Sequence, residues 1–191
     1  LQARGLAELT WLEGGSRRHL YEALGRGEWH VCHFLGRGGP GGARVSDKGL
    51  MAPAGGSGEA RRLSAPDLVR PLTEHRSLRV AVLHAREELP GGQLRNTFTS
   101  TAELMVRQGI PAVLSIPYKI RDEAAVELFR AFYEALALGR PVDAALAEGR
   151  QAISFAVANT VEFGAPALFT GSSDGLVFVP PGAAEPDESE A

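Results

Sequence analysis

The sequence predicts a three-layer α/β domain built around a mainly parallel β-sheet. Short apolar runs typical of strands alternate along the chain with segments whose apolar residues recur at helical spacing. One run, residues 78–85, is apolar on both faces, as an inner strand of a parallel sheet must be when helices cover both sides. The length of 191 residues, with no internal repeat, favours a single domain.

Each expected element has a local signal. Strands are expected where β-branched and aromatic residues follow one another, and helices where a capping residue precedes an amphipathic run. The expected strands are residues 6–12, 29–35, 78–85, 111–117, 166–171 and 175–179, the last two around a turn at 172–175. The expected helices are residues 16–24, 64–75, 96–108, 122–138 and 141–157. Residues 49–54 and 60–63 are expected to pair as a small hairpin.

Three helices carry finer expectations. Ser64 should be the N-cap of the second helix, and Pro71 should shorten or kink it because proline lacks the backbone donor. Gly109 should end the third helix. Asp122 should be the N-cap of the fourth. The apolar face of that fourth helix is expected to consist of Ala125, Leu128, Phe129, Phe132 and Leu136, with Tyr133 packing beside it.

Composition and charge exclude several classes of protein. Apolar residues make up 44% of the chain and charged residues 23%, as in an ordinary globular protein. The net charge of −3 includes four acidic residues in the last twelve, so residues 1–179 carry only +1 and predict no nucleic-acid interface. No apolar run approaches the roughly 18 residues of a membrane span, and no leader pattern begins the chain, so we expect a cytoplasmic protein. The single cysteine, Cys32, excludes an internal disulfide and a cysteine-rich zinc site.

The two ends of the chain differ from the rest. Residues 180–191 are rich in proline and acidic residues and have no large apolar residue, which predicts a disordered tail or linker after a domain of residues 1–179. The chain begins with leucine, so we expect it to be a piece of a larger protein. Arginine outnumbers lysine by 18 to 2, which suggests a bacterial source with a GC-rich genome.

A glycine-rich loop follows the strand expected at residues 29–35. Gly36, Gly38 and Gly41 match the G-x-G-x-x-G pattern of a dinucleotide-binding loop. That pattern must lead into a helix whose N-terminus holds the pyrophosphate, and an acidic residue must follow roughly 20 residues later. Neither condition is met, because no helical pattern follows and Glu59 stands in the wrong context. We therefore expect no nucleotide, no other cofactor and no metal.

Two expected strands end in loops that carry arginine. Arg37 follows the strand at 29–35, and Arg86 follows the strand at 78–85. Chemistry in open α/β sheets collects at the carboxyl ends of the strands. If these two strands are neighbours, the two arginines should face each other across one rim.

Two segments around these strands, WHVCHFLGRGG and LRVAVLHAREE, match known motifs. The first resembles the H-F-x-G-H-G motif, and the second the strand ending in N-A-C-E, of CHAT domains, which are bacterial members of the caspase-like clan of cysteine peptidases. The most specific similarity lies in residues 111–153, where a strand is followed by two helices, and the resemblance extends over about residues 6–178. It implies a caspase-like fold from which the family's first strand and helix are missing.

The resemblance places arginine at both catalytic positions. Arg37 stands where the family has its general-base histidine, and Arg86 stands where it has the nucleophilic cysteine. Arginine stays protonated at any working pH, so it can neither accept a proton as a base nor attack a carbonyl. We therefore expect a catalytically inactive pseudopeptidase. By resemblance, it would be a regulatory or protein-interaction module in a larger bacterial signalling or defence protein, with a protein partner or fused sensor or repeat domains.

Other residues complete the candidate cleft, and alternatives stay open. The expected cleft residues, besides the two arginines, are His33, Gly36, Gly38, His84, Glu87 and Asp122. An active peptidase with a relocated dyad is one alternative, although Cys32 and His33 are adjacent in a strand and should point to opposite faces. An anion-sensing cleft formed by Arg37 and Arg86 is another. Internal acids that could instead pair with those arginines are Glu87, Glu88 and Asp47.

Overall fold

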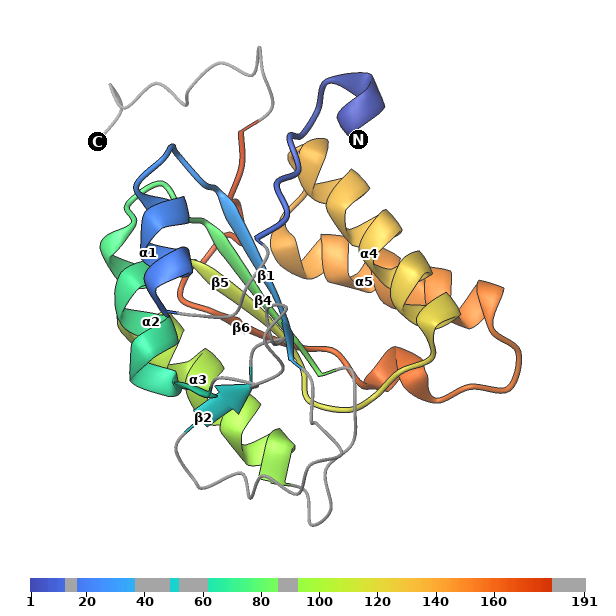
Figure 1. The fold of residues 1–191 in the computed structure, drawn as a ribbon. Helices are drawn as coiled ribbons and strands as arrows, with labels where there is room; N and C mark the ends of the chain where they lie inside the picture. Colours follow the sequence, from blue (N-terminus) through green and yellow to red (C-terminus); the bar gives the residue numbers. More distant parts are fainter. Residues whose placement is uncertain (13–16, 37–48, 52–61, 86–92, 180–191) are drawn as a thin grey trace.

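The computed structural model describes residues 1–12, 17–36, 49–51, 62–85 and 93–179 (Figure 1). The elements in chain order are η1 (Gln2–Arg4), α1 (Arg17–Leu24), β1 (Val31–Gly36), β2 (Gly49–Met51), β3 (Arg62–Ser64), α2 (Ala65–Glu74), β4 (Val80–Ala85), α3 (Gln93–Arg107), β5 (Ala112–Ile116), α4 (Asp122–Ala137), α5 (Val142–Ala156), η3 (Glu162–Gly164) and β6 (Ala167–Thr170). The α/β class is therefore confirmed.

The main sheet has the strand order β1-β4-β5-β6. β1 pairs in parallel with β4 and β4 pairs in parallel with β5, whereas β6 is antiparallel to β5. β2 and β3 form a separate antiparallel pair, as the sequence predicts for residues 49–54 and 60–63. The expectation of a mainly parallel sheet is thus correct.

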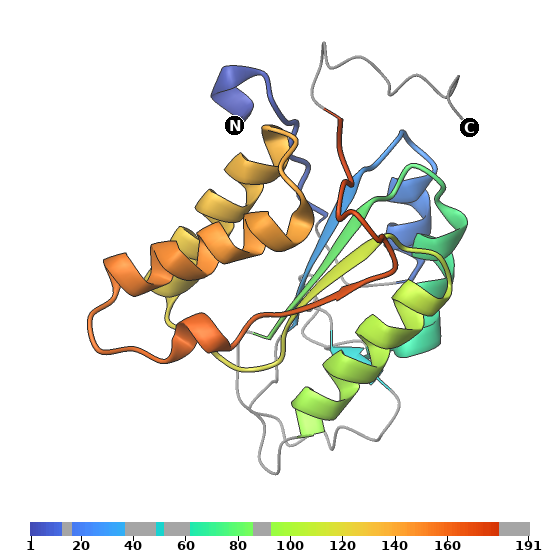
Figure 2. The same ribbon diagram turned by 180° about the vertical axis from the view of Figure 1, so that it is seen from behind.

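Helices cover both faces of this sheet, which makes three layers (Figures 1 and 2). α1, α2 and α3 lie on one face, and α4 and α5 lie on the other. Successive strand residues alternate between the two faces. Val80 and Val82 of β4 therefore pack in the core beneath α4 and α5, while Ala81 and Leu83 pack in the core beneath α2 and α3. This alternation determines which helix layer each strand residue contacts.

Both faces of the inner strands are buried, as the apolar runs predict. All five residues of β5 are buried, and Val80 to Leu83 of β4 are at most 1% exposed. On α4, the expected apolar face is confirmed, since Leu128 and Phe132 are fully buried and Phe129 packs against the same core. Burying side chains of this size contributes roughly 1.5–3 kcal/mol each.

Two expected strands are not strands. Residues 6–12 have no regular secondary structure, because no described segment pairs with them, and Trp11 remains 72% exposed. Residues 175–179 also form no strand. Gly175 has a φ of 70°, and its carbonyl accepts a hydrogen bond from the amide of Val142, while Val177 is buried in the core. The second segment therefore packs against the fold without joining a sheet.

Three expectations about where helices begin and end are wrong. Asp122 is not the N-cap of α4, because Arg121 occupies that position with extended backbone angles. Pro71 does not shorten α2, which continues to Glu74, since Pro71 and Leu72 are buried and their packing offsets the missing hydrogen bond. α3 begins at Gln93, three residues earlier than expected, whereas Gly109 with a φ of 103° ends it as predicted.

Within the described ranges, no helix is both long and apolar enough to cross a bilayer.

Candidate functional site

The carboxyl ends of β1 and β4 lie side by side in the sheet. In the register of this parallel pair, Leu35 is opposite His84 and Gly36 is opposite Ala85, the last residue of each strand. The chain therefore leaves the sheet at two adjacent positions. The residues that follow, namely Arg37 and Arg86 together with Gly38, Asp47, Glu87 and Glu88, lie outside the described residues.

Two histidines from these strands share one face of the sheet. His33 of β1 is opposite Val82, two positions before His84 of β4, so both side chains lie on the same face of the sheet, the one covered by α4. Their ring centroids are 6.0 Å apart. Phe129 of α4 contacts both rings, with centroid distances of 4.4 Å to His33 and 5.3 Å to His84. The structure thus brings together His33 and His84, two of the predicted cleft residues.

Tyr133 of α4 completes this cluster. Its hydroxyl lies 3.0 Å from Nδ1 of His33. Burial raises the pKa of Tyr133, so the phenol keeps its proton and can donate it in the hydrogen bond to Nδ1. In that arrangement the ring proton of a neutral His33 sits on Nε2. We call His33, His84, Phe129 and Tyr133 the histidine cluster.

The surroundings of His33 favour its neutral form. Enclosure of the ring by protein lowers its pKa, and repulsion by His84 lowers it further, although part of the residue is exposed to solvent. A histidine with a lowered pKa and a tyrosine on Nδ1 is neutral at physiological pH. The hydrogen bond between Tyr133 and His33 connects β1 to α4, so His33 has a structural role here.

Cys32 lies on the opposite face from the histidine cluster. It packs with Phe34 against the core beneath α2 and α3. Burial raises the pKa of the thiol to about 11, so almost none of it is thiolate at neutral pH. Because the thiolate is the nucleophilic form and His33 lies on the other side of the sheet, these two residues do not form a catalytic pair.

Asp122 lies away from the histidine cluster. It is the first residue of α4, exposed, and seven residues before Phe129, which corresponds to roughly 10 Å along the helix axis. An acidic residue in the first turn is stabilised by the positive end of the helix dipole.

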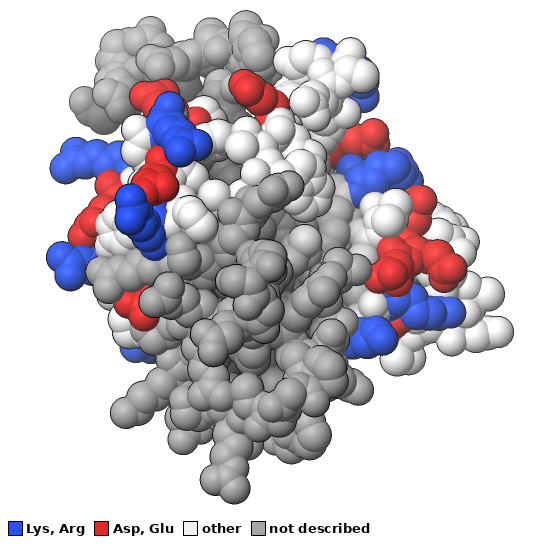
Figure 3. All heavy atoms as spheres, viewed as in Figure 1, with Lys and Arg blue, Asp and Glu red and all other residues white. Residues whose placement is uncertain are grey.

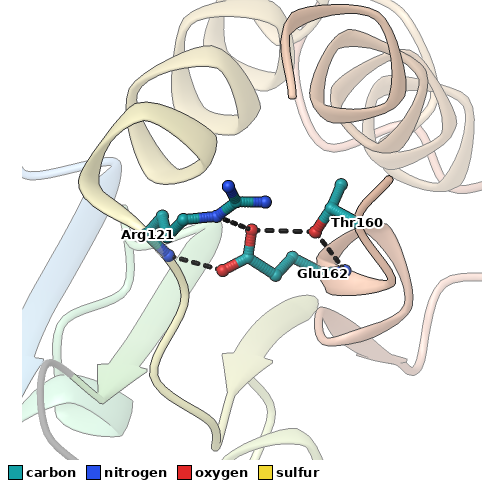
Figure 4. Close-up of polar contacts among 3 residues, drawn as sticks. All are labelled: Arg121, Thr160 and Glu162. Carbon is teal, nitrogen blue, oxygen red and sulfur yellow. Dashed lines mark hydrogen bonds and ion pairs between the residues drawn. The ribbon is translucent and has the colours of Figure 1, made fainter. Parts of the chain in front are cut away.

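A polar network near the start of α4 has no signal in the local sequence. The carboxylate of Glu162 accepts hydrogen bonds from the Arg121 backbone amide at 2.7 Å, from Arg121 Nε at 3.0 Å and from Thr160 Oγ1 at 2.9 Å (Figure 4). The hydroxyl of Thr160 in turn accepts a hydrogen bond from the backbone amide of Glu162 at 3.0 Å. This network attaches the loop that follows α5 to the turn between β5 and α4.

The charge of Glu162 is stabilised by these contacts. Desolvation alone would raise its pKa, but the hydrogen bonds from Arg121 and Thr160 outweigh it and lower the pKa below its ordinary value. Arg121 and Glu162 are 41 positions apart in sequence, so helical or strand periodicity could not have paired them. The Tyr133 contact with His33, 100 positions apart, was missed for the same reason.

The described residues contain no group of three or more histidine, cysteine, aspartate or glutamate side chains that could hold a metal ion.

Comparison with models of known protein families gives a match. A family model described as "CHAT domain" matches residues 1–157, a range that includes β1, β4, β5 and both helices of the α4–α5 layer. No curated protein matches the chain. The matched range contains residues 111–153, where the resemblance is most specific, as well as β1 and β4, which carry the histidine cluster.

Proposed function

This chain belongs to the CHAT domain family, and from that premise we propose that it is a catalytically inactive member that acts as a regulatory or protein-interaction module. By resemblance to the family, the larger protein would be a bacterial signalling or defence protein, in which this domain contacts a protein partner or fused sensor or repeat domains. The domain would keep the scaffold of a caspase-like peptidase without its chemistry.

The pairing of β1 with β4 is the observation that carries this proposal. Arg37 follows Gly36 and Arg86 follows Ala85, and Gly36 and Ala85 are register partners at the carboxyl ends of two parallel strands. Catalytic residues of open α/β sheets are placed at such ends. The chain therefore has arginine at the two positions where the resemblance calls for a base and a nucleophile, and arginine can be neither.

The described residues near this edge supply no replacement dyad. Cys32 is held as a thiol on the far face of the sheet. His33 is engaged by Tyr133, and His84 is only 7% exposed and packs against Phe129. These arrangements argue against a peptidase whose dyad has moved to these positions.

Labelling with a thiol-reactive peptidyl probe tests the proposal. The wild-type chain should show no covalent labelling by intact-mass spectrometry. The double variant Arg37→His/Arg86→Cys, which restores the family's residues, serves as the control that the probe and the cleft are competent. Labelling of the wild type at Cys32, lost in Cys32→Ser, would contradict the proposal.

Anion binding is a second candidate function. The adjacency of β1 and β4 favours it, because positive charges on the residues that follow two paired strand ends would be stabilised by an anion bound between them. Guanidinium groups bind carboxylate and phosphate through paired hydrogen bonds. An acidic peptide or a phosphate would thus suit this edge of the sheet.

Thermal unfolding with and without anions tests this candidate. Phosphate, a nucleotide and an acidic peptide are compared at matched ionic strength, and a bound anion should raise the melting temperature. Arg37→Ala/Arg86→Ala should abolish the rise, whereas Arg26→Ala/Arg107→Ala, which removes two exposed arginines elsewhere, should retain it. Equal shifts in both double variants would rule out a site at Arg37 and Arg86.

A further inference from the structure

His75 connects two segments that lie far apart in the sequence. It directly follows Glu74, the last residue of α2, and its Nε2 accepts a hydrogen bond from the backbone amide of Trp29 at 2.9 Å. A backbone amide can only donate, so Nε2 of His75 carries no proton and the single ring proton lies on Nδ1. The contact with Trp29 therefore requires the neutral form of His75.

Trp29 in turn holds α1 in place. Its indole Nε1 donates to the carbonyl of Ala23 in α1 at 2.8 Å, and its own carbonyl accepts from Ser77 Oγ at 3.2 Å. α1 lies beside α2 and adds Leu20 and Leu24 to the apolar core on this face of the sheet (Figure 1). A helix of eight residues is marginal by itself, so its position depends on contacts such as the one with Trp29.

The charged form of His75 has a different partner within reach. Ser77 Oγ lies 3.0 Å from Nε2, so a proton gained at Nε2 can be donated to this hydroxyl oxygen. The same proton excludes the hydrogen bond from the Trp29 amide, because two N–H groups would then face each other. His75 is half-buried, and the C-terminal end of α2 stabilises positive charge there. One proton from the solvent thus separates two arrangements of His75.

Ion pairs engage charged groups on this side of the molecule. Figure 3 shows positive and negative side chains interspersed on the flank that α1 and α2 form. Here Arg70 Nε lies 3.0 Å from the carboxylate of Glu74, so the acidic neighbour of His75 has a cationic partner already. The other charged and titratable side chains on segments 25–30 and 74–79, which meet at His75, are Arg26, Glu28, His30, Arg76 and Arg79.

We propose that His75 is a pH-sensitive latch, which holds Trp29 and α1 against the turn between α2 and β4 when its ring is neutral and releases them when it is protonated. Histidine is the side chain whose charge changes between pH 5 and 8, so the latch responds near neutral pH. Lowering the pH favours release, because only the released form binds the extra proton. Release uncovers the part of α2 beside which Leu20 packs and leaves the sheet paired.

The fluorescence of Trp29 between pH 7.5 and pH 5.5 tests the proposal. Trp11 is the other tryptophan of the chain, so a Trp11→Phe background leaves Trp29 as the single emitter. Its emission should shift to longer wavelength as the pH falls. His75→Gln, whose amide oxygen can accept from the Trp29 amide at any pH, should abolish the shift. His30→Gln, which removes another titrating ring from the same segment, should retain it.

Hydrogen exchange locates the change. After correction for the intrinsic rate at each pH, amides of Arg17–Leu24 should lose about fivefold in protection at pH 5.5, as expected for one lost hydrogen bond. His75→Gln should keep this protection, and His75→Leu, which has no acceptor, should lack it already at pH 7.5. Any loss of global stability through His33 remains in His75→Gln, so this variant separates the two effects.

Three results would overturn the proposal. The first is a Trp29 emission that does not change with pH, and the second is a shift that persists in His75→Gln. The third is protection of α1 that is the same in His75→Leu and in the wild type at pH 7.5.

Discussion

At the scale of single residues, the two histidines show how environment sets chemical capability. His33 lies in the middle of β1 and His84 is next to the last residue of β4, its parallel neighbour. Yet His33 is enclosed by Phe129, Tyr133 and His84, which favours the neutral ring and occupies its Nδ1. The position of a histidine in the fold therefore does not by itself make it a base.

The lowered pKa of His33 predicts a pH dependence of stability. The unfolded chain binds a proton on this ring below about pH 6.5, whereas the folded protein resists binding it until far lower pH, near 3. The free energy of unfolding should therefore decrease as the pH falls below about 6.5. Since the exposed side of the ring is screened by solvent, we expect a loss of at most about 1 kcal/mol by pH 5.

Urea unfolding of the wild type and His33→Gln at pH 7.5 and pH 5 measures this effect. The glutamine variant has no titrating ring, so its free energy of unfolding should fall less between the two pH values. Parallel pH profiles for the two proteins would show that His33 does not contribute.

At the scale of elements, α4 and α5 depend on contacts that no helical pattern reveals. The N-terminus of α4 has Arg121 as its N-cap residue, with no hydrogen bond from the Arg121 side chain to the helix backbone. Instead, the carboxylate of Glu162, which follows α5 in the chain, accepts hydrogen bonds from the backbone amide and the guanidinium of Arg121. The α4–α5 layer is therefore joined at this end by charge and by hydrogen bonds as well as by apolar packing.

Removing the Glu162 carboxylate should destabilise this layer. Glu162→Ala leaves the Arg121 amide and the Thr160 hydroxyl without their acceptor, and we expect a loss of about 1–2 kcal/mol in the free energy of unfolding. The matched control is Glu127→Ala, whose ion pair with Arg130 lies on the helix surface and should cost less than about 0.5 kcal/mol. Equal effects in chemical denaturation would mean that the network stabilises no more than a surface pair.

The packing of α5 against α4 should be sensitive to any side chain added at Gly149. A Cβ at this position would lie 2.8 Å from Leu128 Cδ1, which would have to move, and 3.0 Å from the Leu128 carbonyl oxygen, which is a tight contact with the backbone. Gly149→Ala should thus lower the free energy of unfolding by about 1–3 kcal/mol, despite the better helix propensity of alanine. Gly27→Ala, where a Cβ meets nothing within 4 Å, should show no such loss in the same thermal or urea experiment.

At the scale of the whole molecule, the layers could be predicted and the sheet edges could not. The runs at 78–85 and 111–117 became the buried inner strands β4 and β5 because being apolar on both faces suits only the middle of a covered sheet. The weaker runs at 6–12 and 175–179 do not form strands, because a strand needs a partner and no described segment pairs with them. The β2–β3 hairpin does form as predicted, since its two strands are close in sequence and can pair with each other.

Removal of residues 180–191 tests where the domain ends. The acidic, proline-rich composition predicts that this segment adds nothing to the core, so residues 1–179 alone should melt within about 2 °C of the full chain. Digestion with a glutamate-specific protease should also cut this segment before any other, as followed by mass spectrometry. A drop of several degrees on truncation would show that the domain extends beyond residue 179.

The class of fold, the family, the inner strands and most helix positions could be predicted from the sequence alone. These features follow from local composition and periodicity, or from motifs that can be read along the chain. The three-dimensional structure was needed to show that β1 and β4 are neighbours, that Tyr133 contacts His33, that Glu162 supports α4 and that residues 6–12 pair with no other described segment. Each of these depends on contacts between residues far apart in sequence, which periodicity within one element does not encode.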